Sequence, residues 1–282
     1  MDESRIKKHP ILSVEKTPDF VTFKFNGKKL TAKHDEMISS ALFAHNIHIF
    51  GRHQKDNSPQ GMFCANGQCS QCLVIADGIP VKSCVTPVKD GMEVRSLDGL
   101  PELLKDDKAV KKAGKIPIVK TSVLIIGGGP AGMSAALDLG RMGVKCIICD
   151  DKQVLGGKLS LQTHNFFGSI RDCYAGSRGM DIGDILASLI NDEKKLDVWV
   201  NSPVVGVFSD GLVGVVRDGK YTLIKPERLL ITTGAREKTL AFPGCDLPGV
   251  YGAGAFQTLV NRDLIKPTDK PVSYTHLTLP TN

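Results

Sequence analysis

The sequence predicts two consecutive domains, an α+β domain of β-grasp layout and then a Rossmann-type α/β domain with a β-meander inserted into it. Two observations predict this order. Before residue 98, short alternating strands surround one helix and a cysteine-rich loop; after residue 120, a nearly continuous apolar strand leads through a glycine-rich turn into a helix. A chain of 282 residues is long enough for each domain to bury its own core.

The first domain begins with a predicted hairpin. Residues 20–25 alternate apolar and polar side chains as a half-buried strand does, and the Asn-Gly pair at 26–27 is a strong hairpin signal. A helix is expected from about residue 37 to residue 46, with Asp35 as its N-cap. The other strands expected in this domain are 28–32, 72–76, 81–84 and 92–94.

The second domain has the strand–turn–helix order of a parallel sheet. Residues 122–126 are apolar after Ser122, as in a strand buried on both faces, and 130–141 are expected to form the next helix. The remaining expected elements are strands 144–149, 196–200 and 229–232, helix 181–195, and the meander strands 204–208, 212–216 and 220–224.

Composition sets the domain boundaries. The predicted parts are a loose polar arm (1–18), the first domain (19–98), a charged linker (99–119), the second domain (120–271) and a terminal segment (272–282). The terminal segment resembles a translated sequencing adapter, so we exclude it from the fold and expect the natural sequence to be truncated near Pro271.

Four cysteines have the spacing of iron–sulfur ligands. Cys64, Cys69, Cys72 and Cys84 follow the pattern Cys-x4-Cys-x2-Cys-x11-Cys. Two irons need four thiolates, which a loop with three close cysteines and a fourth on a neighbouring strand supplies. A zinc site is the alternative, but structural zinc sites favour two separated Cys-x2-Cys pairs. The spacing therefore predicts a plant-type [2Fe–2S] cluster. Residues 61–92 also resemble the ferredoxin-like domain of sarcosine-oxidase-type and cyanide-synthase-type oxidoreductases.

The other cysteines are interpreted as structural. Cys146 and Cys149 lie in one predicted strand, where residues three apart point to opposite faces, so a redox or metal pair is not expected there. Cys173 and Cys245 are isolated in the sequence.

A glycine-rich turn predicts a dinucleotide site. It follows a buried strand and opens a helix, so its backbone N–H groups would face a diphosphate. Asp150, 23 residues after Gly127, would accept hydrogen bonds from the ribose hydroxyls, with Asp151 as the alternative. The residues predicted to contact the dinucleotide in this turn are Gly127, Gly129, Pro130, Ala131 and Gly132.

The order of later motifs resembles the FAD domain of the pyridine-nucleotide-disulfide oxidoreductase superfamily. A double glycine, the meander and a Thr-Gly-Ala segment follow one another, which implies FAD rather than NAD in this domain. By this resemblance, the further FAD contacts are Gly156, Gly157, Val204, Thr233 and Gly234. Disulfide exchange is not expected, because the redox cysteines of glutathione-reductase-like and thioredoxin-reductase-like members have no counterpart here.

Residues 233–257 narrow the resemblance to the group of sarcosine oxidase alpha subunits, opine oxidases and cyanide synthases. The group implies an oxidoreductase in which FAD and the cluster exchange electrons, with a small-molecule amine or imino-acid donor and a partner subunit or acceptor protein. An NAD(P) site would lie beyond residue 271. The alternatives are an NAD(P)H-dependent reductase and a non-catalytic [2Fe–2S] sensor. Catalytic side chains stay unassigned; Lys158, Gln162 and His164 follow the double glycine.

Charge and hydropathy argue against a nucleic-acid-binding, membrane-spanning or secreted protein. The net charge of +6 is spread along the chain, and its densest basic stretch, 105–120, is interpreted as a solvated linker and not as a nucleic-acid site. No apolar run is long enough for a membrane span, and the N-terminus lacks a secretory signal. A cytoplasmic protein is therefore expected.

Overall fold

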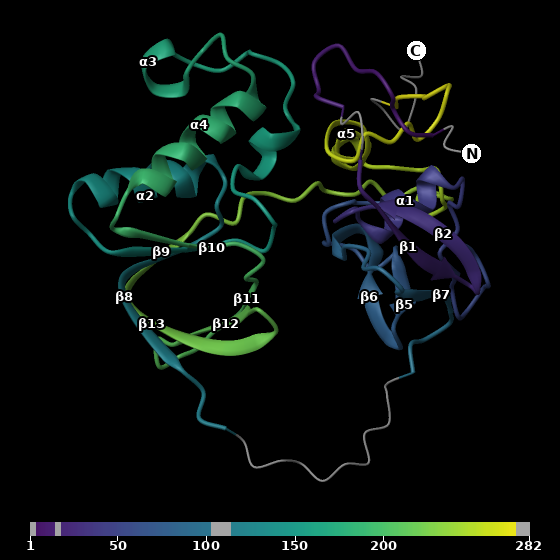
Figure 1. Ribbon diagram of the computed structural model, residues 1–282, viewed down its shortest axis with the longest axis horizontal. Coiled ribbons are helices and arrows are strands. Elements are labelled where there is room, and N and C mark those ends of the chain that lie inside the picture. The colour runs from purple at the N-terminus through teal and green to yellow at the C-terminus, as the bar shows by residue number, and fades with distance from the viewer. Residues whose placement is uncertain (1–3, 15–17, 103–113, 275–282) are drawn as a thin grey trace, which may run out of the picture. The chain divides into compact units, whose positions relative to one another are not determined.

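The structure is a computed structural model of the chain, and it describes residues 4–14, 18–102 and 114–274. Two compact units are present. One contains the described residues up to 102 together with those from 236 on, and the other contains residues 114–235 (Figure 1). Parts of the predicted arm, the predicted linker and most of the predicted adapter segment lie outside the described residues. The predicted domain boundaries therefore stay a prediction.

The first unit has the predicted β-grasp layout, in which one sheet carries a helix and a cysteine-rich loop. The sheet runs β2-β1-β7-β3-β4, with β5 paired to β7 and β6 paired to β5. Asn26 and Gly27 have φ values of 49° and 78°, as the expected hairpin turn requires. The elements are β1 Phe20–Phe25, β2 Lys28–Lys33, α1 Ile38–Ala44, β3 Gly51–Arg52, β4 Pro59–Gln60, β5 Leu73–Ala76, β6 Ile79–Lys82, the 3-10 helix η1 Ser83–Val85, β7 Glu93–Asp98 and α5 Ala253–Asn261.

The predicted cap of α1 is wrong. Met37 is the N-cap, no side chain caps the helix, and Asp35 lies before it with φ of 60°. The Ile38 N–H donates to the carbonyl oxygen of Thr86 at 2.9 Å. A neighbouring backbone segment therefore satisfies a donor of the first turn that Asp35 was expected to satisfy.

The N-terminal arm is not loose at residues 4–6. The Ile6 N–H donates to the Leu264 carbonyl at 2.8 Å, and the Lys266 N–H donates to the Ser4 carbonyl at 2.7 Å. Between these bonds, Arg5 forms an ion pair with Glu36, and both side chains are only 6% exposed. A charged side chain stays buried here because its partner is buried beside it.

Residues 236–274 pack with the first unit. Ala255, Leu259 and Ile265 are fully buried in the same core as Phe43 of α1. The Ser40 hydroxyl donates to the Asp263 carboxylate at 2.7 Å and adds a polar link to this packing. A segment that follows the second unit in sequence therefore completes the core of the first.

The second unit is built on one parallel sheet extended by the meander, in the order β10-β9-β8-β13-β12-β11 (Figure 1). The third meander strand and the return strand, predicted separately, are one strand, β13, which pairs antiparallel with β12 and parallel with β8. The elements are β8 Ile118–Ile126, α2 Pro130–Arg141, β9 Cys146–Cys149, the 3-10 helix η2 Gly157–Leu161, α3 Ile170–Cys173, α4 Gly179–Asp192, β10 Leu196–Trp199, β11 Val204–Val207, β12 Val213–Arg217 and β13 Lys220–Ile231.

Two apolar cores cover the two faces of this sheet. α2 and α4 pack on one face, where Cys146 is buried, and side chains of the meander pack on the other face around Cys149. The expected opposite orientation of these two cysteines is confirmed. Burial raises the pKa of the Cys149 thiol to about 12. Neither thiol faces the other, so they do not form a redox pair.

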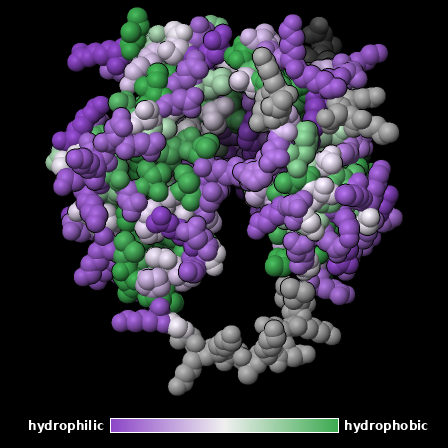
Figure 2. Space-filling model, viewed as in Figure 1, coloured by the Kyte–Doolittle hydropathy of each residue, from purple (hydrophilic) through white to green (hydrophobic). Residues whose placement is uncertain are grey.

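The visible surface of both units mixes apolar side chains among polar ones (Figure 2). In the described part of the chain, we find no helix whose length and hydropathy would let it cross a bilayer.

Candidate cofactor sites

The four predicted ligand cysteines lie together in the first unit. Cys64, Cys69 and Cys72 are on the loop before β5, as expected, whereas Cys84 lies in η1 and not at the end of a strand. The Ser83 N–H donates to the Cys72 carbonyl at 3.0 Å, so η1 is held directly against the end of the loop. Cys72 and Cys84 are fully buried, and Cys64 and Cys69 are half-buried.

Contacts among the four thiols shift their ionisation. Contact with the Cys69 and Cys84 thiols lowers the pKa of Cys64, and contact with the Cys84 thiol lowers the pKa of Cys72 to about 7. The same contacts raise the pKa of the other two thiols: Cys64 raises that of Cys69, and Cys64 and Cys72 raise that of Cys84. The four thiols thus lie in contact with one another, in the order Cys69, Cys64, Cys84 and Cys72. Thiolates are the form that binds metal.

Backbone N–H groups of the loop point at the sulfurs. The Cys69 N–H donates to Cys64 Sγ at 3.3 Å, and the Asn66 N–H also bonds this sulfur. The Lys82 ammonium donates to the Gly67 carbonyl at 2.6 Å and so ties the loop to β6. Such N–H groups stabilise cluster thiolates, and the site therefore fits a [2Fe–2S] cluster. The four thiols are not arranged around one metal ion, and among the described residues no other group of three or more His, Cys, Asp or Glu side chains is.

The glycine-rich turn of the second unit joins β8 to α2 as predicted. Gly127 has φ of 108°, and a Cβ there would lie 2.4 Å from the Thr232 carbonyl oxygen. A Cβ on Gly132 would lie 2.0 Å from the Gly127 carbonyl oxygen, so α2 approaches the strand as closely as its glycine allows. Pro130 and Ala131 form the first residues of α2. The turn therefore needs glycine at positions 127 and 132, because a side chain at either position would collide with backbone atoms.

Asp150 lies beside this turn, at the end of β9. Its Oδ2 accepts the Gly128 N–H at 2.6 Å and its Oδ1 accepts the Lys152 N–H at 2.8 Å. Burial raises the pKa of this carboxyl, while the two backbone bonds act in the opposite direction. A carboxylate with one bond on each oxygen still has lone pairs for ribose hydroxyls. The alternative, Asp151, is exposed and pairs with Lys152.

The double glycine packs on the same turn. The Gly156 N–H donates to the Gly128 carbonyl at 2.8 Å, and a Cβ on Gly157 would lie 2.9 Å from the Cα of Gly129. Gly156 and Gly157 both have positive φ values, of 115° and 53°. The space beside Gly129 is otherwise open, since a Cβ there would meet only the Cα of Gly157, at 4.0 Å. This cradle of bare backbone fits a diphosphate.

Two other predicted contacts lie near the turn. Thr233 follows Thr232, whose hydroxyl donates to the carbonyl oxygens of Ile126 and Gly127, so the predicted Thr233-Gly234 segment lies beside the turn. Val204 begins β11, and the Ser202 N–H two residues earlier donates to the Asp150 carbonyl at 2.8 Å. The second unit therefore brings all the predicted FAD residues to one end of its sheet; that each contacts FAD stays a prediction.

Sequence reasoning missed several residues that shape these sites. Gly128 is as constrained as its neighbours, because a Cβ there would lie 2.3 Å from Leu155 Cδ2. Lys82 and Ser83 adjoin the cluster loop only in the folded chain. The double glycine that follows Leu155 could have indicated that Gly128 lies in a close contact, whereas no sequence signal pointed to Lys82 or Ser83.

The three unassigned polar residues after the double glycine differ in their surroundings. Lys158 is exposed in η2, and the main chain and Cβ of Gln162 pack against Gly179. The His164 ring stacks on Phe166 and Phe167, with centroid separations of 5.7 and 4.9 Å. None of these contacts gives a catalytic role.

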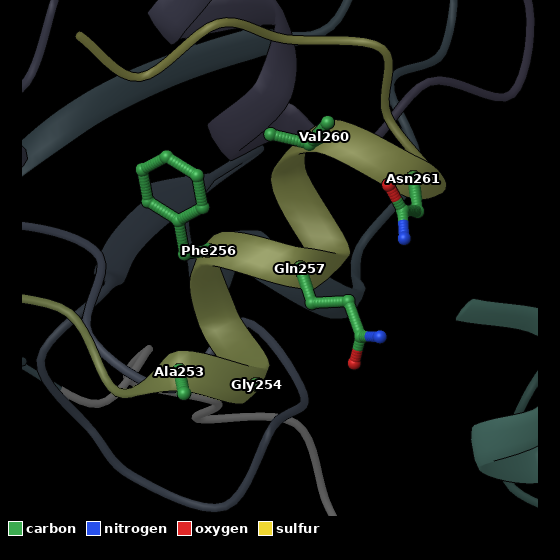
Figure 3. A pocket seen from close by; sticks show the side chains of 6 residues that line it. All are labelled: Ala253, Gly254, Phe256, Gln257, Val260 and Asn261. Atoms are coloured by element: carbon green, nitrogen blue, oxygen red, sulfur yellow. The ribbon is translucent and has the colours of Figure 1, made fainter. Parts of the chain in front are cut away.

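A shallow depression runs along α5 in the first unit (Figure 3). None of its lining side chains is charged, so it offers no ionisable group for chemistry. The lining residues are Ala253, Gly254, Phe256, Gln257, Val260 and Asn261.

Comparison with known families agrees with both sites. Residues 19–99 match a 2Fe-2S iron-sulfur cluster binding domain, and residues 121–277 match the pyridine nucleotide-disulphide oxidoreductase family. The chain belongs to the pyridine nucleotide-disulphide oxidoreductase family. This family member thus combines a [2Fe–2S] domain with an FAD-binding oxidoreductase domain. The predicted family, fold class and two cofactors are confirmed.

Individual relatives match either most of the chain or about half of it. The chain is 26% identical to sarcosine oxidase subunit alpha of Rhizobium meliloti over 90% of its own length and 32% of that protein. It is 33% identical to hydrogen cyanide synthase subunit HcnB of Pseudomonas protegens over 51% of its length and 31% of that protein. The crystal structure of L-proline dehydrogenase from P. horikoshii superimposes with a TM-score of 0.77 and 25% identity, over 95% of this chain and 50% of that one. The chain spans half or less of these proteins.

Proposed function

We propose that this chain is the electron-relay part of a flavoprotein that oxidises an amine or imino acid, such as sarcosine, proline or an opine. The observation that carries the proposal is the pairing of sites in one chain: a four-cysteine loop on one unit and a glycine cradle on the other. A likeness to sarcosine oxidase subunit alpha over 90% of the chain, and to L-proline dehydrogenase over 95%, supports amine oxidation.

The chemistry comes from the cofactors: bound FAD takes up electrons in pairs and releases them singly, and a [2Fe–2S] cluster carries one electron. The residues of this chain hold and orient these groups. Backbone N–H groups around Gly127 and Gly129 face the diphosphate, and the Asp150 carboxylate accepts from the ribose. Four cysteine thiolates hold the irons. Loop N–H groups directed at Cys64 offset its negative charge.

Several relatives are named as subunits, which supports a partner subunit that carries the amine-oxidising site. We place an NAD(P) site, if the complete protein has one, after residue 271. Cytoplasmic location is part of the same proposal. NAD(P)H as sole donor is the competing hypothesis, and a cluster that serves only as a sensor is the least favoured.

The test uses the complete gene product, purified without oxygen together with the product of any adjacent amine-oxidase-type gene. Flavin absorbance and about two irons per chain are expected. Sarcosine, proline, an opine, NADH and NADPH are then added separately, and flavin bleaching and the EPR signal of the reduced cluster are recorded.

The proposal predicts that one amine or imino acid bleaches the flavin and produces the cluster signal, and that both need the partner subunit. Full reduction by NADH or NADPH without any partner would instead establish the reductase hypothesis. A colourless protein that binds zinc would refute the relay altogether.

A further inference from the structure

A buried hydroxyl beside the cluster ligands has no role in the site described so far. Ser83 is fully buried in η1, immediately before the ligand Cys84. Its hydroxyl oxygen is buried and has no hydrogen-bond partner of good geometry among the described residues. An unpaired buried hydroxyl destabilises a folded domain, so Ser83 is a candidate to bond a group that binds beside it.

The position of Ser83 identifies that partner. The Ser83 N–H donates to the Cys72 carbonyl at 3.0 Å, which holds the two residues side by side. Both Ser83 and Cys72 are fully buried, so water does not compete for this contact.

We propose that the Ser83 hydroxyl donates a hydrogen bond to the Cys72 sulfur when this sulfur binds iron, and that this bond raises the reduction potential of the cluster. Reduction adds one negative charge to the cluster and its sulfurs. A donor aimed at a ligand sulfur stabilises the more negative form more strongly, because the hydrogen bond strengthens with charge on the acceptor. Ser83 is therefore a positioning and tuning residue that contacts the ligand and does not itself hold iron.

The inference rests on the proposed function only in assigning the cluster to electron transfer, and its test measures the cluster directly. Ser83→Ala removes the hydroxyl. Ser39→Ala is the matched control, since Ser39 lies in α1 of the same unit, is equally buried, and also has an unpaired hydroxyl. Both variants of the complete protein are examined by iron analysis and by EPR-monitored redox titration.

Ser83→Ala should retain about two irons per chain and show a roughly tenfold lower ratio of reduced to oxidised cluster at a fixed solution potential, which corresponds to about 59 mV for one electron. Ser39→Ala should titrate like the wild type. A Ser83→Ala protein that keeps its iron and titrates like Ser39→Ala would overturn the proposal.

A second pair of variants covers the case in which Ser83→Ala fails to hold iron. Ser83→Thr and Ser83→Val have nearly the same shape, and only the first keeps the hydroxyl. The proposal expects the valine variant to have the lower potential of the two. Equal potentials would overturn it, and so would iron retained in the threonine variant but lost from both the alanine and valine variants, since the hydroxyl would then serve assembly and not the potential.

Discussion

Gly127 offers a direct test of the FAD cradle, through the variant Gly127→Ala. Its φ of 108° is disfavoured for alanine, and the added Cβ would lie 2.4 Å from the Thr232 carbonyl oxygen. Backbone atoms would have to separate by about 1 Å to reach ordinary contact. Gly143→Ala is the matched control, because Gly143 also has a positive φ, of 78°, but an added Cβ would meet open space.

The comparison isolates the contact with Thr232. A left-handed conformation costs a non-glycine residue about 1–2 kcal/mol, and this cost applies to both variants. Overpacking against a backbone atom adds about 1–3 kcal/mol to Gly127→Ala alone. The turn that faces the diphosphate would open to relieve this strain. We therefore expect Gly127→Ala to lose affinity for FAD. That loss corresponds to a dissociation constant raised roughly 5- to 150-fold over the Gly143→Ala protein.

The assay is titration of the flavin-free complete protein with FAD, followed by fluorescence quenching, with iron content measured in parallel. Iron should stay at about two per chain in both variants, because the cysteines belong to the other compact unit. If Gly127→Ala binds FAD within about twofold of Gly143→Ala, the close contact of Gly127 with Thr232 does not shape the FAD site.

Three further outcomes are expected. Cys64→Ala should lose cluster iron and keep flavin, whereas alanine at the exposed Cys173 should change neither; retention of two irons in the first variant would contradict the ligand assignment. Arg5→Met leaves Glu36 buried without its partner, so thermal unfolding should show the first unit destabilised by about 3–5 kcal/mol, and an unchanged transition would argue against the ion pair. Burial raises the pKa of Cys149 from 9.0 to about 12, so its favourable contribution to stability is complete below pH 9 and declines above it, by at most ~1.4 kcal/mol per pH unit. Urea unfolding between pH 8 and about 11 should therefore show a steeper loss for the wild type than for Cys149→Val, and parallel curves would refute the burial argument.

Both cofactor sites were predictable because their signals are local. The spacing of Cys64, Cys69 and Cys72 and the run from Gly127 to Gly132 each lie within ten residues, and local chain geometry decides whether such a run can surround a cluster or face a phosphate. The helix over 130–141 was also predicted with its observed bounds, since the glycine turn before it and its apolar spacing are both local.

Only the tertiary structure decided which distant segments meet. The Ile38 N–H of α1 bonds the Thr86 carbonyl in place of the Asp35 cap. Arg5 pairs with Glu36, 31 positions away, and forms a backbone β-bridge with Ile265, 260 positions away. Ser83 became a neighbour of Cys72 through the β5–β6 hairpin and η1. Such contacts depend on long-range packing, and the periodicity of residues within one segment does not indicate them. The sequence by itself thus determined the two cofactors and the residues predicted to bind them, and the tertiary structure decided which other groups surround those residues.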